Sequence, residues 1–348
     1  MNKIKYIITV LVILLATMII YCAEHIGKGV KNGIELCINS VIPSLFLFSV
    51  ISIFIINAEI FSHNKIIDFL SNLLFGLRGE IGAICLISTI GGYPIGATML
   101  NELYNKGRIS KISAQTSLNF CINPGPAFII GMVGNGIYNN QAIGLIILFA
   151  SLISTSICSR LNRKKITLTT RILKQTQLNY IDALLKSVKS SVRNMGIICG
   201  WVVVATAITE VISNLNMPSV IGCFLEVTSG VITAANITTI YFVAFLIGFG
   251  GIAVHLQAIS SANAISPKYS QIFTWKLFQG LVTSGITFIL LKLFPQTLYV
   301  SSNSTKLTMT YTNGNIFSAI ITILFIMCTL IFLNQNVNKC RNFKKYMI

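Results

Sequence analysis

The fold of this chain is decided by Gly91-Gly92-Tyr93-Pro94-Ile95-Gly96-Ala97, which interrupts a hydrophobic segment at its centre. The next apolar segment is interrupted in turn by Asn123-Pro124-Gly125-Pro126. In hydrocarbon every backbone N–H and C=O needs a partner, so irregular backbone persists only where protein or a water-filled cavity surrounds it. Paired Gly/Pro interruptions therefore predict a substrate path or binding site within the membrane. The alternative is a pair of structural kinks, because Gly and Pro are common in membrane helices.

The composition is that of a polytopic membrane protein. Hydrophobic residues make up 54% of the 348 residues and charged residues only 10%, against about 25% charged in soluble domains. The net charge is +17, but the basic residues gather at the ends of apolar segments, as the positive-inside rule requires. No nucleic-acid partner is therefore expected. A basic surface suits the anionic headgroups of a lipid bilayer, and an anionic substrate is a further interpretation that charge alone does not select.

Apolar segments that approach the about 20 residues needed to cross a bilayer predict an all-α protein with about 8 spans. The candidate spans are 6–22, 36–58, 81–103, 141–159, 195–213, 240–260, 274–294 and 316–334. Residues 113–134 and 220–237 are apolar but hold polar residues and breaks, so they are expected to be re-entrant or interfacial.

A basic stretch divides the chain into two similar halves, each with a Gly-Gly pair inside a span: Gly91-Gly92 and Gly250-Gly251. Corresponding interrupted spans indicate an internal two-fold repeat with a binding site at its interface; chance similarity between apolar segments is the alternative. The expected parts are an N-terminal membrane anchor helix (1–32), a first repeat (33–160), a basic cytoplasmic loop (161–186), a second repeat (187–294), and an outer loop with a C-terminal helix and basic tail (295–348).

Polar groups within or beside the apolar segments supply the candidate binding residues. Glu226 could bind a cation or a substrate, or it could be an acidic residue favoured by the dipole at the start of a helix. His255 and Gln257 offer both donors and acceptors, or they could simply join helices. The N–H groups exposed at helix breaks can hold an anion. The predicted substrate-binding residues are Gly91, Gly92, Tyr93, Pro94, Gly96, Asn119, Asn123, Pro124, Gly125, Glu226, Gly250, Gly251, His255 and Gln257.

Enzyme chemistry is not expected, because the chain has no nucleotide-binding P-loop, no Ser-His-Asp arrangement and no zinc-protease motif. The nine cysteines form no CxxC pair and the three histidines are scattered, so no metal site and no cofactor are predicted. Two other acids lie in apolar segments, Glu102 and Glu210, and each is open to a functional or an interfacial interpretation. A coupling ion and the oligomeric state are left open.

With these residues, the chain resembles the YlbJ-type sporulation integral membrane proteins, also called SpoVV, which are built from nucleoside-recognition (Gate) domains. The resemblance covers residues 33–290. The elements that carry it are Ile42-Pro43-Ser44-Leu45-Phe46, Gly92-Tyr93-Pro94-Ile95-Gly96-Ala97, Asn123-Pro124-Gly125-Pro126-Ala127-Phe128, Gly250-Gly251 through His255-Leu256-Gln257, and the Glu-containing segment Glu226–Gly230. It implies that residues 33–160 and 187–294 are Gate-like repeats.

The resemblance further implies transport of a small anion, dipicolinic acid, across the outer forespore membrane of a sporulating bacterium. Dipicolinate is an aromatic dianion at neutral pH, which backbone N–H groups with Asn, Gln and His nearby would suit. Two alternatives stay open: a nucleoside or other small-solute carrier, and a non-transporting sporulation membrane assembly protein. A nucleoside site would favour carboxylates for the ribose, and only Glu102 and Glu226 could supply them.

Overall fold

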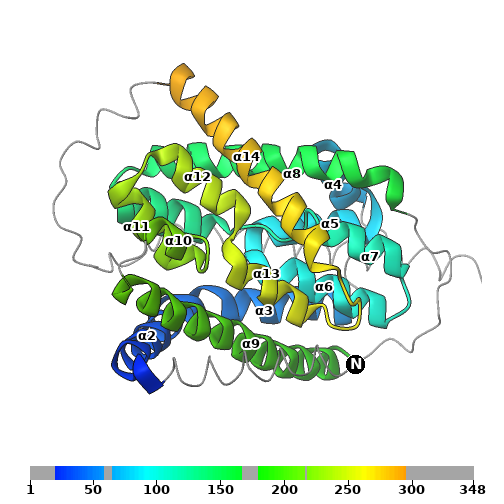
Figure 1. Cartoon of the computed structure of the whole chain (residues 1–348). Helices are drawn as coiled ribbons and strands as arrows, with labels where there is room; N and C mark the ends of the chain where they lie inside the picture. The colour runs from blue at the N-terminus through cyan, green and yellow to red at the C-terminus, as the bar shows by residue number, and fades with distance from the viewer. Residues whose placement is uncertain (1–19, 59–64, 167–178, 216–217, 295–348) are drawn as a thin grey trace, which may run out of the picture. The chain divides into compact units, whose positions relative to one another are not determined.

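The computed structural model describes residues 20–58, 65–166, 179–215 and 218–294. These all belong to the first of the two units of the chain, Met1–Ser301 and Ser302–Ile348. The ordered elements in these ranges are helices (Figure 1), which confirms the all-α prediction. The predicted span 316–334 and the whole part 295–348 lie outside the described residues, as does nearly all of the first predicted span, 6–22.

In the described ranges, four helices are long and apolar enough to cross a membrane. They are α8 (Gln141–Asn162) with the short η3 (Arg163–Lys165), α9 (Tyr180–Asn214), the pair α12–α13 (Ile240–Phe249 and Gly251–Ser261), and α14 (Tyr269–Leu293). A fifth results if α4 (Lys65–Phe75) and α5 (Gly79–Gly91), which meet at 70°, count as one bent span. Membrane-spanning helices imply a lipid bilayer around the protein.

Two of the predicted spans are not single regular α-helices, and the break in 81–103 lies where the Gly91–Ala97 stretch predicts it. Residues 81–103 are divided into α5 and α6 (Tyr93–Asn105), because the backbone at Gly92 leaves the helical region. Residues 36–58 belong to a longer helical run made of α2 (Ala23–Leu36), the π-helical η1 (Cys37–Val41) and α3 (Ile42–Asn57). Only its end, Leu45–Asn57, is strongly apolar, since α2 carries charged residues throughout.

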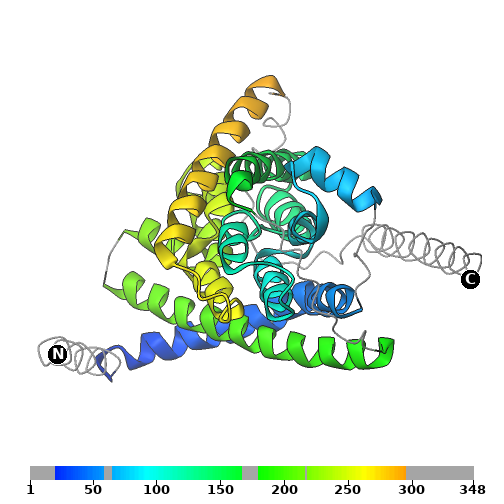
Figure 2. The same cartoon turned by 90° about the vertical axis from the view of Figure 1, so that its right-hand side faces the viewer.

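The run α2–η1–α3 packs antiparallel against α9 (Figures 1 and 2). The direction follows from the contacts. Lys28 near the start of the run pairs with Glu210 near the end of α9, with 2.9 Å between Nζ and Oε1. Asn57 at the end of the run donates to the Ser187 hydroxyl near the start of α9, at 3.1 Å. The pairing with Lys28 supports the interfacial interpretation of Glu210.

Two glycines let these helices approach closely, as small residues spaced four apart do in membrane proteins. A Cβ built on Gly29 would lie 2.7 Å from Ala207 Cα, and one built on Gly33 would lie 2.8 Å from Val203 Cα. Both obstacles are backbone atoms, which cannot rotate away.

Gly33→Leu is therefore expected to lower the free energy of unfolding by about 1–3 kcal/mol, the usual cost of overpacking. Gly27→Leu is the matched control, because a Cβ at Gly27 meets nothing within 4 Å. Thermal unfolding of both purified variants in detergent checks the prediction. Equal losses of stability would show that helix propensity, and not the close approach to α9, controls this helix.

The remaining helices surround the predicted breaks. After α6 come α7 (Lys111–Leu118), an irregular stretch over residues 119–126, and the π-helical η2 (Ala127–Ile137), so the predicted 113–134 segment is two helices around a break. In the second half, α10 (Ser219–Cys223) and α11 (Val227–Ile237) occupy the predicted 220–237 segment. Helix α14 packs along both α12 and α8, and α13 packs on α6 and α9.

The predicted basic loop, 161–186, is shorter than expected, because α9 already begins at Tyr180. The reason is a buried face at helical spacing, formed by Ala183, Ser187 and Ser191, which allows this charged segment to pack as a helix. The helices that follow the two Gly-Gly pairs, α6 and α13, contact each other. This contact is compatible with two related halves, but the two-fold repeat stays a prediction.

Candidate functional site

Gly92 separates α5 from α6. Its φ of +94° and ψ of 175° lie in a region that only glycine occupies without strain. The Gly92 N–H still donates to the Ser88 carbonyl, at 3.3 Å, and closes the last turn of α5. Tyr93 and Pro94 then open α6, where a missing proline N–H is harmless. The Gly-Gly-Tyr-Pro stretch therefore encodes a helix end and a helix start in direct succession.

The Gly91–Gly96 and Asn123–Pro126 breaks lie against each other. A Cβ built on Gly125 would lie 3.4 Å from the Gly92 nitrogen and 3.1 Å from the Ile90 carbonyl oxygen. A Cβ on Gly96 would overlap the Cys121 carbonyl oxygen. The irregular stretch 119–126 thus rests directly on the beginning of α6.

The second Gly-Gly pair joins the same region through Tyr93. Gly250 and Gly251 have φ of +87° and +78°; Gly250 lies between α12 and α13, and Gly251 is the first residue of α13. The Tyr93 hydroxyl donates to the Ile247 carbonyl, at 2.7 Å. A Cβ built on Gly250 would lie 3.2 Å from the Tyr93 ring. All three predicted breaks therefore meet around one tyrosine.

The N–H groups at the start of α13 do not have the role that the sequence predicts. The Ile252 N–H donates to the Phe224 carbonyl and the Ala253 N–H to the Leu225 carbonyl, both at 2.8 Å. These donors are already satisfied by the segment before α11. In this structure the turn at Gly251 is thus a packing contact between α13 and residues 224–225, and it offers an anion neither of these donors.

Gly92→Ala is expected to reduce stability by about 1–3 kcal/mol, because alanine is strained at this positive φ. Its Cβ would also lie 3.0 Å from the Leu45 side chain. Gly91→Ala is the matched neighbour: Gly91 is helical, and its Cβ would meet only the Ile95 side chain, most closely its flexible Cδ1 end. Thermal unfolding of both variants in detergent is the measurement. A Gly91→Ala protein that unfolds as early as Gly92→Ala would contradict the role of the backbone conformation.

Asn123 is the centre of a buried hydrogen-bond network. Its Nδ2 donates to the Ser88 hydroxyl at 3.1 Å and to the Phe120 carbonyl at 2.7 Å. Its Oδ1 accepts from the Thr155 hydroxyl at 2.9 Å and from Gln279 Nε2 at 3.0 Å. The network ties the irregular stretch to α5, α8 and α14. The predicted site contained Asn123 but none of its three side-chain partners, because they lie on distant segments.

Lys276 extends this network and was not among the predicted site residues. Its side chain is fully buried. Its Nζ donates to the Ile122 carbonyl at 2.6 Å and to Gln279 Oε1 at 2.7 Å. The sequence carried a signal, since Lys276 lies inside the predicted span 274–294 and ionisable residues in membrane spans usually have a function.

His255 faces the protein interior and is fully buried. Its Nε2 lies 2.8 Å from the Phe249 carbonyl oxygen. The ring packs against those of Phe249, Phe273 and Tyr269. Gln257, in contrast, points from α13 toward α9, and its Nε2 lies 3.4 Å from the Ile198 carbonyl. Of the two predicted residues, only His255 adjoins the α14 segment that carries Lys276.

Two further predicted residues have local structural roles. The Glu226 carboxylate caps α11: Oε1 accepts from the Thr228 N–H at 2.9 Å and Oε2 from the Ser229 N–H at 2.7 Å. This is the helix-start interpretation of Glu226, with both oxygens in use. Asn119 donates to the Asn162 side chain at 3.0 Å, near the end of α8. Among the described residues, no group of His, Cys, Asp or Glu could hold a metal ion.

Comparison with known proteins gives one distant relationship. No protein-family profile matches the chain, and no solved structure is significantly similar to it. The chain is 21% identical over 343 residues to the sporulation integral membrane protein YlbJ of Bacillus subtilis (strain 168). The aligned region covers 82% of this chain and 84% of YlbJ. The Gate domains stay a prediction. The protein is an integral membrane protein with all-helical architecture and a distant homologue of a sporulation integral membrane protein.

Proposed function

We propose that the chain is a membrane transporter of a small organic anion, and that this anion is dipicolinate, moved across the outer forespore membrane. The observation that carries the proposal is the meeting of three backbone breaks. Gly92 lies against Gly125, and Tyr93 connects both to Gly250. Irregular backbone buried among membrane helices is typical of transporter substrate sites. Separate structural kinks would have no reason to be in contact.

The arrangement of the halves supports the same proposal. Helices α6 and α13 each follow a Gly-Gly pair and pack on one another, and α3 and α9 also contact each other. We propose that these helices belong to two Gate-like repeats that move relative to each other in alternating access. The similarity to YlbJ suggests a role in sporulation. The choice of dipicolinate as the substrate comes from the resemblance to the YlbJ-type proteins.

The occupied Glu226 carboxylate disfavours the nucleoside alternative. Both of its oxygens accept backbone N–H groups, so a ribose would have to displace a helix cap. Glu102 is the other acid considered for a ribose; it lies half-buried in α6.

Uptake into vesicles tests the proposal. The purified full-length protein is reconstituted into liposomes that contain Tb³⁺, which luminesces when dipicolinate reaches it. Uptake above that of protein-free liposomes, with no uptake of radiolabelled uridine, is the expected result. Uridine uptake without dipicolinate uptake would favour the nucleoside carrier. A folded, reconstituted protein that moves neither would overturn transport and favour an assembly role.

A further inference from the structure

Lys276 is a buried cation without a carboxylate partner among the described residues. It is fully buried in α14, and no Asp or Glu of the described ranges forms an ion pair with it. Its contacts are one backbone carbonyl and one amide oxygen. Buried charges in proteins are normally paired, because an unpaired charge loses its hydration without compensation.

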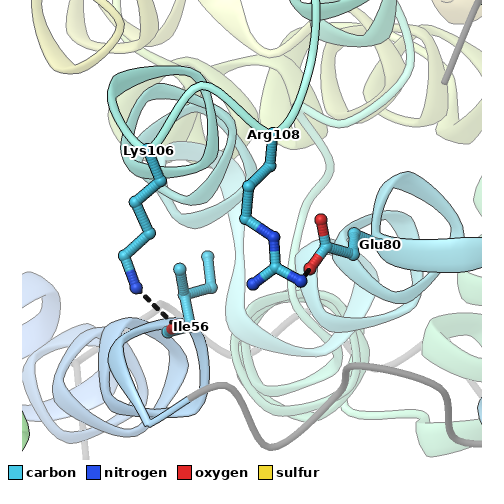
Figure 3. Close-up of polar contacts among 4 residues, drawn as sticks. All are labelled: Ile56, Glu80, Lys106 and Arg108. Atoms are coloured by element: carbon cyan, nitrogen blue, oxygen red, sulfur yellow. Dashed lines mark hydrogen bonds and ion pairs between the residues drawn. The ribbon is translucent and has the colours of Figure 1, made fainter. Parts of the chain in front are cut away.

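A second buried lysine, Lys106, has contacts that are typical of a structural role (Figure 3). Lys106 follows α6 and donates to the Ile56 carbonyl at the end of α3, at 2.8 Å. A cation at a helix C-terminus is favoured by the helix dipole. An ion pair between Arg108 and Glu80 is found in the same part of the structure. Lys276 instead donates to Ile122, the residue directly before the Asn123–Pro126 break.

We propose that Lys276 is the fixed positive charge that binds a carboxylate of the transported anion. This inference rests on the proposed function. An ammonium group has three N–H donors, and the Ile122 carbonyl and Gln279 occupy two of them. The third donor and the net charge are left for the ligand.

The side chains near Lys276 suit an aromatic carboxylate. Phe273 lies one helical turn before Lys276 on α14, and its ring packs against His255. The buried Nδ1 of His255 has no hydrogen-bond partner among the described residues. The rings of Phe249, Phe273 and Tyr269 pack around His255. A planar aromatic acid could place its ring among these side chains and its carboxylate on Lys276. A flexible aliphatic acid would gain the charge contact without the ring contacts.

In this structure the irregular stretch 119–126 is hydrogen-bonded to α14 at Lys276 and Gln279. Two contacts hold this stretch on α14: Lys276 Nζ to the Ile122 carbonyl, and Gln279 Nε2 to Asn123 Oδ1. A ligand carboxylate would compete with the Ile122 carbonyl for the ammonium group. Binding would thereby loosen the contact of this stretch with α14, which links ligand binding to movement of the break.

The test compares Lys276→Gln with Lys106→Gln in the purified full-length protein. Calorimetry measures binding of dipicolinate and of its neutral analogue pyridine-2,6-dicarboxamide. Glutamine keeps an N–H donor but removes the charge. Lys276→Gln is expected to weaken dipicolinate binding at least about tenfold, the size of a lost charge-assisted hydrogen bond, and to leave binding of the diamide unchanged. Lys106→Gln is expected to change neither.

The outcomes separate this inference from the proposed function. If Lys276→Gln binds dipicolinate with wild-type affinity, or loses affinity equally for dipicolinate and the diamide, the role of the charge is overturned and transport is left standing. Binding that depends on Lys276 but no vesicle uptake would overturn transport alone. If Lys276→Gln does not fold, the test is made on the wild-type protein, which is expected to bind dipicolinate more tightly than the diamide. Equal affinities, or no binding of dipicolinate, would overturn the inference.

Discussion

Asn123→Ala is expected to lower the free energy of unfolding by about 3 kcal/mol. The substitution removes four hydrogen bonds at once, two donated by Nδ2 and two accepted by Oδ1. Each buried polar group that is left without a partner costs about 1–3 kcal/mol. The single proton of the Thr155 hydroxyl can be donated to the Ser151 carbonyl instead, so part of the loss is compensated. The Phe120 carbonyl loses the hydrogen bond that Asn123 Nδ2 donates to it.

The matched control is Asn236→Ala. Asn236 is exposed, and its side chain makes one hydrogen bond within its own helix, to the Ile232 carbonyl at 3.2 Å. Surface substitutions of this kind usually change stability by less than about 0.5 kcal/mol. Thermal unfolding in detergent measures both. Similar small shifts for the two variants would mean that the network around Asn123 does not hold the break in place.

Gly96→Ala is the second substitution for which a large effect is expected, a loss of about 3 kcal/mol or more. The added Cβ would overlap the Cys121 carbonyl oxygen and lie 2.8 Å from Ser88 Cβ. Overpacking typically costs about 1–3 kcal/mol, and more where the obstacle is rigid. The Cys121 carbonyl belongs to the backbone of the irregular stretch, so relief requires that stretch to leave α6.

Gly131→Ala serves as the control for Gly96→Ala, because a Cβ at Gly131 meets nothing within 4 Å. The amount of each protein in isolated membranes and its unfolding temperature are the measurements. We expect Gly96→Ala to fall in both and Gly131→Ala to remain close to wild type. A stable, abundant Gly96→Ala protein would show that residues 119–126 do not rest on α6.

The sequence by itself determined the features that depend on local backbone chemistry. Apolar segments of membrane length predicted helices, and the Gly-Gly pairs at Gly91-Gly92 and Gly250-Gly251 predicted breaks. The structure gives Gly92 and Gly250 a positive φ that other residues rarely adopt. The burial of His255 agrees with the cost of placing an imidazole in hydrocarbon. Each of these predictions needs only the identity of a residue and of its neighbours along the chain.

The tertiary structure decided which partner each polar group has. Lys276 and the Ile122 carbonyl are 154 positions apart in the sequence, and Gln279 and Asn123 are 156 apart. Glu226 could have been a ligand or a cap, and the N–H groups of its own helix made it a cap. Hydrogen bonds act over about 3 Å, so helix packing and not sequence spacing determines which of these groups meet.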